Sequence, residues 1–207
     1  MKLIGADIGQ KRDPTCIVAV QLKYLKVGDR SDSHFFVRMI ERLPLGTPYP
    51  EVARRLGEVW SNLAARPGSG PRAYIDATGV GLPVVDLVRA YVSAPRSVWA
   101  VIFNHGDART EYEDERRIVL GKAFLVSRLQ VLLQSGRLHL PQTPEAKRMG
   151  EELLDYEIRI DEGANDRYGA FKLGSSDDLV TALGLAVQVD PRGMPLFAFM
   201  ANDPEWE

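Results

Sequence analysis

The stretch LIGADIGQ, residues 3–10, places an acid where a buried strand would otherwise continue. The apolar or small residues from Leu3 to Ala6 lead into Asp7, and Gly9 follows two positions later. Asp is depleted inside β-strands, so Asp7 needs a physical reason. Two interpretations are open: Asp7 ends the strand in a turn, for which Asp-Ile-Gly is suitable, or its carboxylate binds a ligand.

Two acidic motifs follow far downstream. Asp76 ends a short apolar run in YIDATGVG, residues 74–81, and can cap the next helix or bind a ligand. Asp177 and Asp178 open the apolar segment SSDDLVTALGLA, residues 175–186. In a first helical turn each acid gains about 0.3–1 kcal/mol from the helix dipole. Taken alone, each of these acids therefore has a purely structural explanation.

The three motifs together favour a metal site. The ends of neighbouring strands in an α/β sheet form the crevice where ligands bind. Carboxylates crowded there raise each other's pKa unless a cation neutralises them. Oxygen donors without a Cys or His cluster select Mg²⁺ or Mn²⁺, and two such ions about 3.5–4 Å apart hydrolyse phosphodiesters. We therefore expect Asp7, Asp76, Asp177 and Asp178 to hold divalent cations that cut a nucleic-acid backbone.

Composition narrows the class of protein. The chain has 207 residues, 45% of them hydrophobic, which suits one globular domain. A net charge of -2 does not favour a protein that simply coats DNA. The lone cysteine excludes an internal disulfide, and three scattered histidines give no zinc pattern. No signal-peptide layout and no apolar run of about 18 residues occurs, so we expect a soluble, intracellular protein.

Hydrophobic spacing predicts an α/β order. About 45 N-terminal residues carry strand-type runs separated by polar turns, which predicts a three-stranded antiparallel meander. Helical and strand periodicities then alternate to residue 189. The expected helices are 51–65, about 82–91, 113–134, 143–156 and 177–189, and the expected strands are 72–77, 97–103, 137–141, 157–160 and 167–173. Residues 104–115 are expected to form a polar loop, and Ser175 or Ser176 to cap the last helix.

These motifs resemble the nuclease domain of the large terminase subunit of tailed bacteriophages, in the RNase H-like (RuvC-like) superfamily. The resemblance rests on DIGQKRDPT (7–15), YIDATGVGLPVVDLV (74–88), SGRLHLP (135–141) and SDDLVTALGLA (176–186). It implies an α/β, RNase H-like fold with a central mixed sheet, three antiparallel strands followed by parallel strands, flanked by helices. Residues 1–190 would form the nuclease domain and 191–207 a C-terminal tail.

The same resemblance implies a metal-dependent endonuclease that cuts double-stranded viral DNA concatemers during genome packaging. Asp7 would bridge two Mg²⁺ or Mn²⁺ ions, Asp76 would bind one, and Asp177 and Asp178 would complete the shell, with their order open. Double-stranded DNA, the portal protein, the small terminase subunit and a packaging ATPase domain would be partners. The setting would be the cytoplasm of an infected bacterial host, without a membrane. No G-x-x-x-x-G-K-[ST] motif occurs, so we expect an isolated nuclease domain or a stand-alone relative.

Some positions depart from this pattern or are less specific. Ser176 stands where the family often has His, and Asp13 lies in an Arg-Asp-Pro segment that is also a plain turn. Basic residues are candidate DNA contacts: Arg109, Arg116, Arg117, Lys122, Arg128 and Lys172. The alternatives are a solvated helix face with a Glu113–Arg117 pair and a strand-edge role for Lys172.

Three rival functions remain. A Holliday-junction resolvase of the same superfamily would prefer branched DNA to linear DNA. An actin-like or sugar-kinase ATPase uses a similar Asp-Ile-Gly hairpin on phosphate, but it usually needs two such lobes, and it would hydrolyse ATP without nicking DNA. A catalytically silent DNA-binding or assembly module would keep the fold without the acids, whereas acids stand here at all three motifs.

Overall fold

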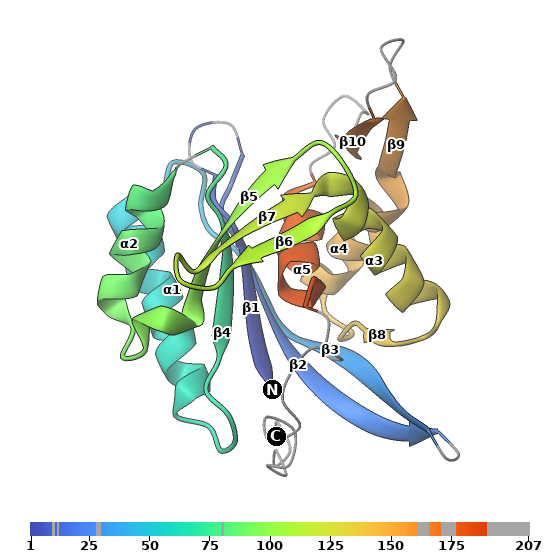
Figure 1. Ribbon diagram of the computed structural model, residues 1–207, viewed down its shortest axis with the longest axis horizontal. Helices are drawn as coiled ribbons and strands as arrows, with labels where there is room; N and C mark the ends of the chain where they lie inside the picture. Colours follow the sequence, from blue (N-terminus) through green and yellow to red (C-terminus); the bar gives the residue numbers. More distant parts are fainter. Residues whose placement is uncertain are drawn as a thin grey trace.

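A computed structural model describes residues 1–9, 11, 13–27, 30–79, 81–160, 166–170 and 177–189. Within these residues the chain folds around an eight-stranded mixed sheet of order β6-β7-β5-β4-β1-β2-β3-β8 (Figure 1). The strands are β1 (Lys2–Asp7), β2 (Cys16–Val27), β3 (Arg30–Arg42), β4 (Arg72–Asp76), β5 (Val98–Asn104), β6 (Arg109–Tyr112), β7 (Arg117–Gly121) and β8 (Leu138–His139). The antiparallel meander β1-β2-β3 and the parallel neighbours β4 and β5 are as expected.

Helices cover both faces of the sheet. One core joins one face to α3, α4 and α5, and a second joins the other face to α1 and α2 (Figure 1). The helices are α1 (Tyr49–Ala64), α2 (Leu82–Tyr91), a short 3-10 helix (Pro95–Ser97), α3 (Lys122–Gln134), α4 (Pro144–Asp155) and α5 (Asp178–Val187). Strand alternation divides β1 between the cores, because Leu3 faces the first while Ile4 and Ala6 face the second. A separate hairpin pairs β9 (Tyr156–Ile160) with β10 (Asp166–Ala170).

Helix α5 lies directly against the central strand β1. A Cβ atom at Gly5 would stand 2.0 Å from the Ala182 carbonyl oxygen and 2.6 Å from the Ala186 nitrogen. From Asp178 to Val187 all residues except Thr181 are buried, as expected for a helix that is apolar nearly all round. The absence of a side chain at Gly5 therefore sets how closely α5 approaches β1.

Gly5→Ala is expected to destabilise the protein by about 1–3 kcal/mol or more, the usual cost of overpacking a core. The added methyl group would meet helix backbone, which cannot rotate away as a side chain can. Urea denaturation followed by circular dichroism measures the change. Gly70→Ala is the control, because a Cβ there meets nothing within 4 Å. Equal stability of the two variants would show that the α5–β1 contact is not tight.

Residues 104–134 differ from expectation. The helix predicted over 113–134 begins only at Lys122, and the hairpin of β6 and β7 replaces the expected loop and first helical turns. Ile118, expected on the helix face, is fully buried in β7, where it pairs with Val101 of β5. This long-range pairing outweighs the local helical spacing of the apolar residues. The alternative Glu113–Arg117 pair is likewise wrong, since Arg116 pairs with Glu113 and Arg117 with Glu115.

Only part of the C-terminal region expected from the sequence lies within the described residues. Asp177, rather than Ser175 or Ser176, occupies the N-cap position of α5, and both serines lie outside the described residues. Lys172 and the tail 191–207 also lie outside them. Thr143 caps α4, because its Oγ1 accepts the Ala146 N–H at 3.2 Å. Among the described helices, none has the length and apolar character to span a membrane.

Candidate active site

The strand ends bring two of the expected acids together. Strands β1 and β4 are parallel neighbours with Ala6 opposite Ile75, so Asp7 and Asp76 end adjacent strands at one edge of the sheet. Helix α5 begins beside them, because its Leu179 N–H bonds to Glu152, and the Glu152 partner Arg42 stands in the same row of the sheet as Asp7. The charges of Asp177 and Asp178 both act on Asp7 in agreement with this placement. All four acids expected from the sequence therefore converge.

Burial and mutual repulsion dominate the electrostatics of this cluster. Removal from solvent raises the pKa of Asp7 well above its ordinary value, and the carboxylates of Asp76, Asp178 and Asp177 raise it further, in that order. Burial also raises the pKa of Asp76. Lys122, the first residue of α3, acts against both shifts because it is the nearby cation. Lys122 is thus the one residue of the expected basic set, within the described chain, whose charge opposes these shifts.

Local turns fix the two strand-end acids. The Asp76 carboxylate accepts the Thr78 N–H at 2.8 Å, and the Thr78 hydroxyl accepts the Phe103 N–H at 2.8 Å. Asp76 therefore shapes its own turn rather than capping α2, which begins at Leu82. After Asp7, the Thr15 hydroxyl closes the loop by accepting the Gly9 N–H at 3.2 Å and donating to the Gly9 carbonyl at 2.9 Å.

Sequence reasoning missed two charged residues beside the cluster. Arg42 at the end of β3 pairs with Glu152 of α4, and the Glu152 carboxylate accepts the Leu179 N–H of α5 at 3.1 Å. Arg42 also hydrogen-bonds the Cys16 thiol, whose pKa burial raises to about 12. Neither Arg42 nor Glu152 stands in a local motif, because their partners lie at least 26 positions away in the sequence.

Other expected DNA contacts are engaged elsewhere. Arg128 donates to the carbonyls of Val187 and Val189 at 3.1 and 3.0 Å, which is the C-terminal end of α5. Arg109 donates to Gln188 at the same end and to Glu111. These two arginines therefore lie away from the acids that open α5, and their role on DNA stays a prediction.

Arg116 lies in the turn between β6 and β7, and Arg117 is the first residue of β7. Arg116 lies over the Trp99 ring at 4.9 Å, and Arg117 over the Tyr112 ring at 4.6 Å. Each also has a glutamate partner, as described above. Their contact with DNA is likewise untested by these interactions. Asp13 is exposed, consistent with the plain-turn alternative.

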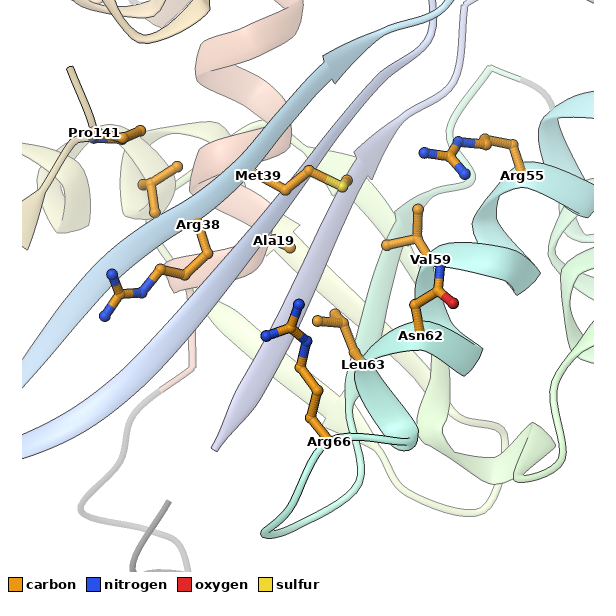
Figure 2. Close-up of a pocket in the computed structure, with 10 residues that line it drawn as sticks. Ala19, Arg38, Met39, Arg55, Val59, Asn62, Leu63, Arg66 and Pro141 are labelled. Atoms are coloured by element: carbon orange, nitrogen blue, oxygen red, sulfur yellow. The ribbon is translucent and has the colours of Figure 1, made fainter. Parts of the chain in front are cut away.

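A groove of about 470 Å³ lies apart from the acids, between α1 and β3 (Figure 2). Arg38, Arg55 and Arg66 surround apolar side chains such as Met39 and Leu63. No acid is among the described residues that line it. Carboxylate chemistry therefore belongs to the strand-end cluster and not to this groove.

The donor types of the cluster fit a divalent cation. Four carboxylates offer only oxygen ligands, which Mg²⁺ and Mn²⁺ prefer, and a cation would relieve the repulsion that raises the pKa of Asp7. Within the described part of the chain, however, no three His, Cys, Asp or Glu side chains are arranged as a ligand cluster. The acids thus converge without forming an assembled coordination shell.

Comparison with known proteins identifies the fold. The sequence matches no family model and no curated protein. The large terminase nuclease of thermophilic phage G20c superposes with a TM-score of 0.61 at 19% identity, over 90% of this chain and 80% of that one, and with 0.60 in its magnesium-bound structure. The human cytomegalovirus terminase nuclease domain gives 0.54 at 15% identity, over 89% and 81%. The nuclease domain of the bacteriophage SPP1 large terminase with bound manganese gives 0.51 at 11%, over 89% and 84%.

These likenesses confirm the expected fold class. The mixed sheet flanked by helices is the fold of large terminase nuclease domains.

Proposed function

We propose that the chain is a divalent-metal-dependent endonuclease that cuts double-stranded DNA. The observation that carries this proposal is the convergence of Asp7, Asp76, Asp177 and Asp178 at one edge of the sheet, in a fold shared with terminase nucleases. Similar structures hold magnesium or manganese, which supports the same choice of cation here.

The chain's own residues suggest a division of labour. The charges of the other three acids all act on Asp7, so Asp7 would be the ligand that bridges two ions. Asp76 would bind one ion, and Asp177 and Asp178 would complete the shell. Bound ions would lower the pKa of a water so that it can lose a proton and attack phosphorus, and they would supply positive charge that stabilises the leaving oxygen. The turn at Thr78 holds the Asp76 carboxylate in place. Lys122 would hold a DNA phosphate beside the acids, since it is the cation that acts on both strand-end carboxylates.

The proposed substrate is concatemeric viral DNA during genome packaging. This follows from the terminase nucleases that the chain resembles in structure. A packaging ATPase domain, a small terminase subunit and a portal protein would be its partners, in the cytoplasm of an infected bacterial host. Residues 1–190 would form the nuclease domain, with residues 191–207 as a tail.

Nicking of supercoiled plasmid tests the function. The protein is expected to convert the plasmid to open-circular and linear DNA with Mg²⁺ or Mn²⁺, and not with EDTA, because the acids bind DNA phosphates only through cations. Asp7→Asn is expected to remove this activity. A four-way junction and a linear duplex of equal length serve as further substrates. Absence of cutting with every ion, or equal cutting by Asp7→Asn, would refute the proposal, and cutting of the junction alone would indicate a resolvase.

A further inference from the structure

The N-terminus of α5 is capped from another helix. Asp177 occupies its N-cap position without a side-chain hydrogen bond to the helix. The Leu179 N–H is instead accepted by the Glu152 carboxylate of α4, 27 positions earlier. First-turn N–H groups have no partner within their own helix, so an external acceptor replaces the usual Ser, Thr or Asp cap. The N-cap acid of the site therefore does not cap its own helix.

Arg42 holds Glu152 in this role. The Arg42 guanidinium pairs with one Glu152 oxygen, while the other accepts the Leu179 N–H. The Glu152 side chain is only 11% exposed, so solvent weakens this pair less than a surface ion pair. Arg42 itself stands in a row across the sheet, because Asp7 pairs with Cys16 and Cys16 pairs with Arg42. This row and the Arg42–Glu152 pair together connect the start of α5 to the strand that carries Asp7.

We infer that Glu152, held by Arg42, is a positioning residue that fixes the first turn of α5 and so places Asp177 and Asp178 relative to Asp7. The inference rests on the proposed metal-dependent function. It predicts a specific effect on cation affinity, because residues that orient metal ligands typically change affinity about 10–100-fold when removed. If Glu152 only stabilised the fold as a whole, its removal would destabilise all elements alike.

Three variants separate these roles. Glu152→Ala removes both the acceptor for the Leu179 N–H and the partner of Arg42. Glu152→Gln keeps an acceptor oxygen but loses the charge, and it is the more conservative variant if Glu152→Ala folds poorly. Glu151→Ala is the matched control, the same residue type one position earlier in α4, where the side chain is exposed.

Mn²⁺ binding by isothermal titration calorimetry is the first measurement. Glu152→Ala is expected to raise the Mn²⁺ dissociation constant about 10–100-fold. Glu152→Gln should raise it less, and Glu151→Ala should have the dissociation constant of the native chain. In plasmid nicking, the Mn²⁺ concentration at half-maximal rate should rise in the same order, with little change in the rate at saturating Mn²⁺. Equal affinities of Glu152→Ala and Glu151→Ala would overturn the inference.

Amide hydrogen exchange is the second measurement and requires neither metal nor activity. Glu152→Ala is expected to accelerate exchange at Leu179 and Val180 while leaving β1 amides unchanged, because only the first turn of α5 loses its acceptor. Unchanged exchange at Leu179, or equal acceleration throughout the chain, would overturn the inference. If the native chain neither cuts DNA nor binds Mn²⁺, the proposed function fails, and exchange still decides whether Glu152 fixes α5.

Discussion

Asp7→Asn is expected to abolish DNA cleavage and, at the same time, to stabilise the metal-free protein. Cleavage should fall by about 10³-fold, the upper end of the loss of about 10²–10³-fold that removal of one preorganised electrostatic group commonly causes, because the charges of the other three acids all act on Asp7. Asn has nearly the same shape but no charge. The variant therefore removes both the cost of burying a charged carboxylate at this position and its repulsion by the neighbouring acids.

The pH dependence of stability gives the sign of this effect. Burial and neighbouring acids raise the pKa of Asp7 in the folded protein, so the folded state binds more protons than the unfolded state at pH values above about 4. The stabilising contribution of Asp7 is complete below the pKa of an Asp in the unfolded chain, about 4. It is lost as pH rises through the raised pKa of Asp7 in the folded protein. The pKa values of Asp76 and Glu152 are also raised, chiefly by burial, and act in the same direction.

Denaturation with urea in EDTA, from about pH 5 to pH 8, measures this dependence. The native chain should lose stability as pH rises, and Asp7→Asn should lose less. Mn²⁺ should restore the native chain at neutral pH, by about 2.7 kcal/mol at a hundred times its dissociation constant, and restore Asp7→Asn less. Asp13→Asn is the control, since Asp13 is exposed in the loop that follows. A steeper loss in Asp7→Asn than in the native chain would contradict the assignment of Asp7 to a repulsive cluster.

The parts of the fold that sequence predicted are those with strong local patterns. The meander and β4 are strand-type apolar runs bounded by polar turns, and α5 is an apolar helix opened by two acids, so local and tertiary preferences agree there. The β6–β7 hairpin was missed because Ile118 continues a helical spacing into α3. Only the pairing with β5, far away in the sequence, makes this segment a strand.

The candidate site shows the same limit. Acids at element ends are visible in the sequence, because Asp inside an apolar strand violates local preference. Glu152 gives no such signal: it stands on an amphipathic helix among other charged residues, and its partner Leu179 is set by tertiary packing. Basic residue type alone also does not place a side chain, since Arg128 binds carbonyls at the far end of α5.

Asp178→Asn is expected to cost more activity than Asp177→Asn, which orders the two acids that the sequence leaves equivalent. Asp178 is 5% exposed, whereas Asp177 is half-buried. The Asp178 charge also raises the pKa of Asp7 more than the Asp177 charge does. Since a charge acts more strongly at shorter range and lower dielectric, Asp178 is the closer electrostatic partner of Asp7. We expect cleavage to fall about 10²–10³-fold in Asp178→Asn and about 10-fold in Asp177→Asn.

Plasmid nicking at saturating and limiting Mn²⁺ measures both losses, and the double variant tests whether the acids act together. Neighbouring groups that serve one site are not additive. If Asp177 acts by supporting the ion that Asp178 holds, the double variant should lose little more activity than Asp178→Asn alone. If the activity losses of the two single variants instead multiply in the double variant, each carboxylate contributes to a separate ion. A larger loss in Asp177→Asn than in Asp178→Asn would reverse the order, and burial beside Asp7 would then not identify the closer ligand.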